Sequence, residues 1–321
     1  MKIAKVVRDL HAECDAIYQR LAKDVNERLK PRVEAQQWFY ISRVKQLQSY
    51  ALKLETGRVA DPRRPDDFFA CTIVVSKLSE IEEAERLVNL IYIAQSRRPP
   101  VDGETHKASS SFAFDDLRLY VAQPESTTGK DPDLDGLIFE VQIKTILQHA
   151  WSIATHDLIY KTNNVSLARE RIAFQIKAML EHAEIAIVEA NRLAETPAVA
   201  KVDKPTAEIF SLIETIGKIW TNDLLPDDRK RLAESIRQTL RICDLNADSF
   251  QGIIEIERRR VNVIPSDLSP YAFTIQALTN NPGINFQHKF GRPHIKTTIV
   301  VHEGIELPEW MACDHPRILR L

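Results

Sequence analysis

Strand-forming and helix-forming segments alternate along the first half of this sequence, and strand signals nearly vanish after residue 165. The clearest strand is FFACTIVV at 68–75, whose eight apolar or near-apolar residues are typical of a buried strand. Further strands are expected at 38–44, 117–122 and 137–145. The order is helix, strand, helix, strand, helix, strand, strand, helix. It predicts an α+β fold in which a mixed β-sheet is flanked by helices.

Helices are expected where apolar residues recur at steps of three and four. In the first half these segments are 3–30, a helix around Tyr50, 79–94 and 146–160. Pro31 is expected to end or restart the first helix. Ser79 and Glu82 have the spacing of a capping box at the start of the third. The segment 96–111 is polar and is interpreted as a loop.

The second half is predicted to be mainly helical. Its helices are expected at 166–194, 206–221, 226–243 and 247–260, with a linker-like break at 194–205 and β-forming residues returning after 284. We therefore expect a first domain over 1–165 and an accessory region over 166–321. The amphipathic helix at 166–194 offers a packing face, which favours a homo-oligomer formed through the C-terminal helices. Oligomerisation module, neutralising domain and sensor all stay open as roles for this region.

Glycine is scarce in this chain. Only 9 of 321 residues are glycine, about 3%, against a usual share of roughly 7%. No glycines have the GxGxxG spacing of a dinucleotide fold or the GxxxxGK[ST] spacing of a phosphate loop. If the protein binds a nucleotide, side chains must therefore hold most of its phosphates. The formal net charge of −2 gives no global basic field for nucleic acid, although a local basic groove is compatible with it.

The sequence also predicts a cytoplasmic protein without a membrane span. It has no run of 18 apolar residues, and its first residues, MKIAKVVRDLHAECD, do not have a signal-peptide core. The four cysteines have no CxxC spacing, which is typical of buried or free thiols in a reducing compartment. The nine histidines show no HExxH motif, so a dedicated zinc site is not expected.

A basic cluster begins at the first predicted strand. Arg43 and Lys45 alternate, so both side chains are expected on one face, and Lys53 follows one helix later. A solvated basic edge is one interpretation of this pattern. The other is a phosphate clamp that replaces the missing glycine loop.

Carboxylates occur on two of the predicted strands. Asp67 opens the buried strand, where metal-dependent nucleotide enzymes place a Mg²⁺ ligand, although this position alone is a weak signal. Glu140, Gln142 and Lys144 alternate with apolar residues and therefore share one face of another strand. This row is either an ordinary wet face or, with Glu140 facing Asp67, part of a two-carboxylate magnesium site.

At this point a specific resemblance appears. The segment EVQIKTILQHAWSIATHDLIYK at 140–161 resembles the closing motif of the RelA/SpoT synthetase family, which reads E-[IV]-Q-[IL]-R-T, then a helix with W and a downstream H, then YK. The family's R-x-K-x-x-x-S-x-x-x-K is matched at full spacing by Arg43, Lys45, Ser49 and Lys53. Asp67 matches the aspartate of the family's D-x-x-G-x-R strand. The resemblance covers roughly residues 38–161.

The resemblance implies a pyrophosphokinase with a nucleotidyltransferase-like synthetase domain. Such enzymes move the β,γ-diphosphate of ATP onto the 3′-hydroxyl of GDP or GTP, giving the alarmones ppGpp and pppGpp of the stringent response. The match implies ATP binding by Arg43, Lys45 and Lys53, catalysis and Mg²⁺ binding by Asp67 and Glu140, and acceptor binding by Phe114, Arg118, Gln142, Lys144 and His156. No hydrolase motif precedes these blocks, so the chain is expected to synthesise rather than degrade.

The chain departs from the family pattern at several positions. The glycine and arginine of D-x-x-G-x-R are Ala70 and Thr72, the arginine of the closing motif is Lys144, and Thr155 replaces an acidic residue. The acceptor motif G-Y-[RK]-S-x-H departs further, because Phe114 stands for the stacking tyrosine, Asp115 for a base and Arg118 for the histidine. The acidic pair Asp115 and Asp116 disfavours a polyphosphate and is able to hydrogen-bond a guanine edge.

Three functions from different classes therefore stay open. The first is an alarmone synthetase. The second is a toxin-like relative that pyrophosphorylates an adenine nucleotide or the 3′ end of tRNA. The third is a catalytically degenerate nucleotide-binding module. A groove beside Glu140 lined by the arginine clusters at 63–64, 97–98 and 258–260 would favour an RNA acceptor.

Overall fold

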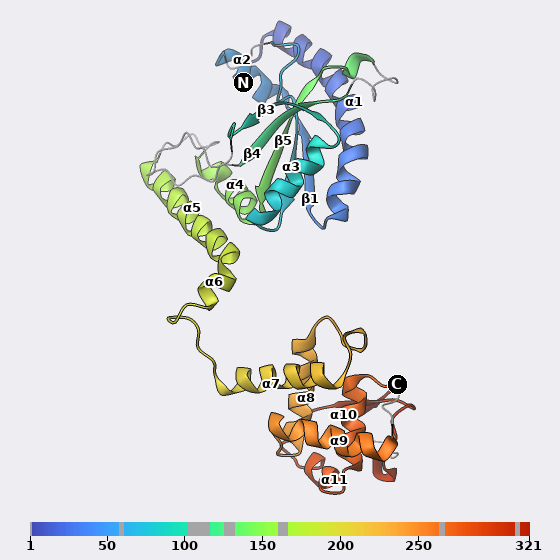
Figure 1. The fold of residues 1–321 in the computed structure, drawn as a ribbon. Coiled ribbons are helices and arrows are strands. Elements are labelled where there is room, and N and C mark those ends of the chain that lie inside the picture. The colour runs from blue at the N-terminus through green and yellow to red at the C-terminus, as the bar shows by residue number, and fades with distance from the viewer. Residues whose placement is uncertain are drawn as a thin grey trace. The chain divides into compact units, whose positions relative to one another are not determined.

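The computed structural model describes residues 2–57, 61–101, 116–124, 132–159, 166–262, 267–311 and 315–321. The chain forms two compact units, Met1–Val199 and Ala200–Leu321 (Figure 1). Each unit has its own hydrophobic core, and the two are described separately below.

The first unit is built on a five-stranded sheet. Its strands are β1 (Phe39–Val44), β2 (Phe69–Val75), β3 (Ile93–Arg98), β4 (Leu117–Ala122) and β5 (Ile138–Thr145), in the order β1-β2-β5-β4-β3. Strands β2 and β5 pair parallel, whereas the other neighbouring pairs are antiparallel. The sheet is therefore mixed, and the predicted α+β fold with flanking helices is confirmed. All four strands expected from the sequence are present.

Strand β3 was not expected. The sequence predicts a helix over 79–94, but α3 (Ile81–Asn89) is shorter, follows the 3₁₀ turn η1 (Leu78–Glu80), and ends before β3 begins. The residues of β3, IAQSRR, do not show a buried strand pattern, because this edge strand obtains its hydrogen bonds from β4 while most of its side chains remain exposed. The expected capping box is also wrong, since Glu80 is the N-cap of α3 and forms no side-chain cap there.

Helix α1 (Lys5–Ala35) continues through Pro31, so the expectation of a break at this residue is wrong. Proline removes one backbone hydrogen bond from a helix. Leu29 and Val33, on either side of Pro31, are both fully buried, and their packing offsets that loss.

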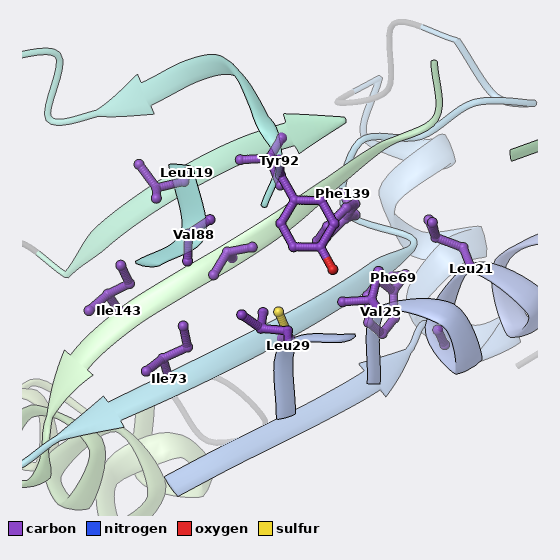
Figure 2. Packing of buried hydrophobic residues seen from close by; sticks show 14 of the residues in the cluster. Leu21, Val25, Leu29, Phe69, Ile73, Val88, Tyr92, Leu119, Phe139 and Ile143 are labelled. Atoms are coloured by element: carbon purple, nitrogen blue, oxygen red, sulfur yellow. The ribbon is translucent and has the colours of Figure 1, made fainter. Parts of the chain in front are cut away.

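Helices α1 and α3 cover one face of the sheet, and the core lies between them and the strands (Figure 2). Leu21, Val25 and Leu29 of α1 pack there with Val88 of α3. They meet side chains of alternate residues on the strands, among them Phe69 and Ile73 of β2, Leu119 of β4, and Phe139 and Ile143 of β5. Because successive residues of a strand point to opposite faces, the intervening residues of these strands lie on the other face.

Three further helices complete the elements around this sheet, namely α2 (Leu47–Glu55), α4 (Ile146–Ile159) and α5 (Leu167–Val188), and the short α6 (Ala190–Ala194) follows. The predicted helix at 166–194 is thus interrupted at Glu189. Helix α5 packs on α4: Trp151 Nε1 donates to the carbonyl oxygen of Ala173 at 2.9 Å, and the Lys177 ammonium lies 4.7 Å from the Trp151 ring centroid. Residues 166–199 therefore lie in the first compact unit, although the sequence places the domain boundary after 165.

The second unit is mainly helical, as predicted. It contains α7 (Lys204–Ile219), α8 (Arg229–Ile242), α9 (Phe250–Val261), α10 (Pro270–Asn280) and α11 (Phe286–Phe290), together with the parallel strands β6 (Ile299–Val301) and β7 (Ile318–Arg320). Asp228 accepts the backbone N–H of Arg231 at 2.9 Å and caps α8. Self-association through the helices after residue 165 stays a prediction.

Within the described ranges, no helix is long and apolar enough to cross a membrane. Cys14, Cys71 and Cys243 are buried free thiols, in agreement with the sequence. Cys313 lies outside the described residues.

Candidate active site

The face of the sheet opposite the core carries polar side chains. On β5, Phe139, Val141 and Ile143 belong to the core, so Glu140 and Gln142, like Lys144, alternate onto the other face. This confirms that acid, amide and base form one row along the strand. The register of β2 and β5 places Ala70 and Thr72 of β2 directly opposite Glu140 and Gln142.

Asp67, Lys45 and Lys53 form a cluster at the start of β2, which we call the donor-side cluster. Antiparallel pairing places Val44 opposite Phe69, so the chain leaving β1 lies beside the chain entering β2. Lys45 Nζ contacts Asp67 Oδ2 at 2.5 Å, and Lys53 Nζ, from α2, contacts the same oxygen at 2.7 Å. The sequence predicted these three residues as site residues, and the structure brings them into direct contact.

The charges of the donor-side cluster depend on one another. Burial raises the pKa of Asp67, but hydrogen bonds and charge from Lys45 and Lys53 outweigh it and hold that pKa below the usual range. Burial lowers the pKa of Lys45, and contact with Asp67 opposes this effect. The ionised aspartate thus keeps two cations at one point of the sheet.

The donor-side cluster also fits a hard cation. Asp67 Oδ1 is buried and has no hydrogen-bond partner, although Oδ2 of the same carboxylate contacts two lysines. A carboxylate oxygen without a partner is a ligand that Mg²⁺ accepts. Within the described residues no cluster of three or more His, Cys, Asp or Glu side chains has a metal-binding arrangement, so ligands beyond the two carboxylates Asp67 and Glu140 would have to come from water or substrate phosphates.

A second group of charges lies across β4 and β5, and we call it the acceptor-side network. Glu140 Oε1 lies 3.5 Å from Arg118 Nη1 and accepts a hydrogen bond from Gln142 Nε2 at 3.0 Å. Asp116 Oδ2 lies 3.1 Å from Arg118 Nη2 and 3.4 Å from Lys144 Nζ. Two carboxylates and two cations therefore alternate along this network.

Burial and charge act in opposite directions in this network. Burial raises the pKa of Asp116, but the charges of Lys144 and Arg118 dominate and lower it below the usual range. Burial lowers the pKa of Arg118, but the negative charges of Asp116 and Glu140 outweigh this effect and raise that pKa above its usual value. Asp116 and Arg118 therefore form an ionised pair at neutral pH.

A cavity of about 470 Å³ lies beside Gln142 and Lys144 of the acceptor side. It is lined by residues of β1, β2, β5 and α4, namely Ile41, Ser42, Arg43, Ala70, Thr72, Gln142, Lys144, His149, Ser152 and Ile153. The structure thus brings Arg43, predicted to bind ATP, onto the same wall as Gln142 and Lys144, predicted to bind the acceptor. Ala70 and Thr72, where the chain departs from the family pattern, line the same cavity.

The apolar wall of this cavity was missed from the sequence. Ile41 and Ile153 are 46% and 64% exposed and line it on opposite elements, β1 and α4. Ile41 alternates with Arg43 on β1, and Ile153 lies one turn after His149 on α4, so strand and helix periodicity contained the signal. Burial, and then the charge of Lys144, lower the pKa of His149, which favours a neutral imidazole.

Several predicted residues cannot be placed in this arrangement. Phe114 lies outside the described residues, as do Tyr160 and Lys161 of the closing motif. The backbone of His156 belongs to α4, but its side chain is not among those described.

Three arginines of the clusters proposed for RNA binding contact other side chains. Arg97 pairs with Glu85 of α3 at 2.7 Å, and the Arg98 guanidinium lies 5.2 Å from the Tyr120 ring centroid. Arg260 pairs with Glu257 and Glu306 within the second unit.

The family model for the region found in RelA/SpoT proteins matches residues 42–165. The chain contains a RelA/SpoT region. This region spans every residue that the sequence predicted for the site, from Arg43 to His156. No curated protein matches the chain.

Solved structures with a similar backbone include small alarmone synthetases of Bacillus subtilis. Synthetase 1 is 16% identical with a TM-score of 0.46, and the match covers 56% of this chain and 95% of that protein. The same synthetase bound to its product pppGpp is 15% identical with a TM-score of 0.46, covering 57% of this chain and 96% of that one. Synthetase 2 is 15% identical with a TM-score of 0.43, covering 55% and 95%.

Proposed function

We propose that the RelA/SpoT region is a pyrophosphokinase that transfers the β,γ-diphosphate of ATP to the 3′-hydroxyl of a guanine nucleotide. The observation that carries the proposal is that one small sheet, inside residues 42–165, carries a lysine–aspartate cluster, a Glu140-centred network, and a cavity lined by Arg43, Gln142 and Lys144. Diphosphoryl transfer depends mainly on positioning and on stabilising charge, and these side chains supply both.

On the donor side, Arg43, Lys45 and Lys53 hold the phosphates of ATP. Arg43 lines the cavity, and the two lysines both contact Asp67. They replace the backbone amides that a glycine-rich loop would provide. In the transfer, the acceptor 3′-oxygen bonds to the β-phosphorus of ATP. The bond from the β-phosphorus to the oxygen that bridges it to the α-phosphorus breaks, and AMP leaves with that oxygen.

On the acceptor side, Glu140 receives the proton of the 3′-hydroxyl. Its carboxylate is 4% exposed and is held by Arg118 and Gln142, so its orientation is set before the substrate arrives. Gln142 and Lys144 line the wall that meets the acceptor, with Phe114 and His156 assigned to the same side by their motif positions.

Asp67 and Glu140 are the residues proposed to hold Mg²⁺, and the unpartnered Oδ1 of Asp67 supports the first of them. When bound, magnesium would neutralise charge on the ATP phosphates and on the diphosphate being transferred. The lysines of the donor-side cluster then share the remaining negative charge.

The test is a transfer assay with the full chain, Mg²⁺ and γ-labelled ATP, offered GDP, GTP, ADP and deacylated tRNA in separate reactions. Label on a guanine nucleotide is the expected result. We expect Glu140→Gln to lower the rate at least 100-fold, the usual scale of a lost general base. Glu83→Gln, an exposed glutamate of α3, is the matched control and should transfer at the wild-type rate.

The other functions are outcomes of the same assay. If only tRNA or ADP becomes labelled, the protein does not use a guanine acceptor, and the toxin-like function replaces the proposed one. No transfer to any acceptor, with Glu140→Gln indistinguishable from wild type, would refute both enzymatic functions and favour a degenerate binding module.

A further inference from the structure

Asp116 occupies an unusual place for an acidic residue in a site that binds phosphates. It directly precedes β4, and its side chain is 20% exposed. Its Oδ2 atom contacts Arg118 through Nε at 3.2 Å and Nη2 at 3.1 Å, and contacts Lys144 Nζ at 3.4 Å. A single carboxylate oxygen is therefore shared by both cations of the acceptor-side network.

The two clusters differ in their charge balance. The acceptor-side network contains Asp116 and Glu140 against Arg118 and Lys144, so its formal charge is zero. The donor-side cluster shares one ionised oxygen of Asp67 between Lys45 and Lys53, and Arg43 lies nearby on the cavity wall. Lys53 also lies 3.6 Å from Asp66 Oδ1, so Arg43, Lys45 and Lys53 stand against Asp66 and Asp67. The described donor-side groups thus retain one surplus positive charge, whereas those on the acceptor side retain none.

We infer that Asp116 determines acceptor specificity by keeping Arg118 and Lys144 engaged, so that the site selects a guanine nucleoside with little regard to its number of 5′-phosphates. This inference rests on the proposed function. The recognised part of the acceptor is its ribose and base, which offer hydrogen-bonding groups but no negative charge. A terminal phosphate of the acceptor therefore adds little binding energy at Arg118 and Lys144.

The physical reason is competition between two anions for the same cations. A phosphate that approaches Arg118 or Lys144 meets the negative charge of Asp116, which already accepts from both. Ion pairs of this type are strong where they are shielded from water, and Lys144 is only 12% exposed in its side chain. Binding the phosphate therefore requires loss of an existing contact for each new one.

The experiment compares the phosphate series guanosine, GMP, GDP and GTP as acceptors for wild type, Asp116→Asn and Asp116→Glu. Wild type should show values of kcat/KM that differ by less than threefold across the series. Asp116→Asn removes the charge that both cations share, while Arg118 keeps its contact with Glu140. The ratio of kcat/KM for GTP to that for GMP should therefore rise about tenfold or more, as expected for one new hydrogen bond to a charged group. The change should appear as a lower KM for GTP, while the KM for ATP stays constant.

Asp116→Glu keeps the charge and should restore the wild-type ratio, which separates the effect of charge from a structural effect. Asp9→Asn, an exposed aspartate of α1, is the charge-matched control and should not change the ratio. Thermal denaturation of each variant checks that it is folded.

Equilibrium binding of GMP and GTP is measured for the same proteins and does not depend on turnover. An unchanged GTP-to-GMP ratio in Asp116→Asn, or a wild type that already prefers GTP tenfold, would overturn the inference while leaving the proposed function intact. Absence of transfer in wild type would overturn the proposed function. The inference would then stand only if Asp116→Asn still tightened GTP binding relative to GMP, and would fall if it did not.

Discussion

The donor-side cluster makes a prediction about stability that does not depend on activity. Asp67→Asn removes the charge that holds Lys45 and Lys53, at 2.5 and 2.7 Å, while keeping the size of the side chain. The side chains of the three residues are between 11% and 22% exposed, so solvent screens their interactions only in part. The substitution leaves two neighbouring ammonium groups without their shared anion.

The magnitude follows from the two lost contacts. A hydrogen bond to a charged group contributes about 1.5–3 kcal/mol. Partial exposure favours the lower end for each, and the neutral amide oxygen recovers part of the loss. We therefore expect Asp67→Asn to lower the free energy of unfolding of the first unit by about 3 kcal/mol at pH 7. With a urea dependence of about 2 kcal/mol per M, this corresponds to a midpoint shift of roughly 1.5 M.

The sign of the pH dependence follows from the depressed pKa of Asp67. A carboxylate with a lower pKa in the folded state stabilises the protein above its unfolded pKa of about 3.9, and this stabilisation is lost as the pH falls through the folded value. The difference between wild type and Asp67→Asn should thus be full at pH 7 and should shrink below about pH 4.

The assay must report on the first unit alone. Samples are equilibrated in rising urea at pH 7 and at pH 3.5, then given the same pulse of deuterium, and peptides from β2 and β5 are read by mass spectrometry. Asp9→Asn is the control for the loss of one exposed carboxylate. An unchanged midpoint at pH 7, or a difference that is the same size at pH 3.5, would refute the assigned role of the Lys45–Asp67–Lys53 contacts.

Three further predictions concern the core, the thiols and the second unit. Phe139→Ala should lower the free energy of unfolding of the first unit by about 3–5 kcal/mol in the same exchange assay, because the ring is fully buried between β5 and the helices; a loss below 1 kcal/mol would contradict that packing. Burial raises the pKa of the Cys71 and Cys243 thiols to about 12, so neither should react with iodoacetamide at pH 8 until urea unfolds the chain; peptide mass spectrometry locates the label, and rapid native labelling of either would disprove its burial. Glu257→Gln should destabilise the second unit by about 2–3 kcal/mol, because Glu257 is 2% exposed and pairs with Arg260 at 2.6 Å; exchange in α9 and α10 measures the loss, and peptides of β2 and β5 should not change.

The local arrangement of the candidate site residues could be predicted from the sequence because its signals are local. The spacing from Arg43 through Lys45 to Lys53, and the alternation from Glu140 to Lys144, are properties of short segments. Strand periodicity alone places Glu140, Gln142 and Lys144 on one face, and the structure agrees.

The position of β3 could not be predicted in this way. An edge strand such as IAQSRR is stabilised by backbone hydrogen bonds to β4, and its side chains carry little of that information. The predicted break at Pro31 is wrong for a similar reason. The burial of Leu29 and Val33 against the sheet outweighs the local preference of proline to end the helix.

The sequence by itself determined which residue types are available for phosphate chemistry: cations on strand and helix in place of a glycine loop, and carboxylates at Asp67 and Glu140. Only the tertiary structure decided how they pair. The antiparallel register of β1 and β2 brings Lys45 to Asp67, and the pairing of β4 with β5 brings Arg118 to Glu140 and Asp116 to Lys144. These contacts join residues far apart along the chain, and the strength of an ion pair depends on distance and burial, which exist only once the sheet has formed.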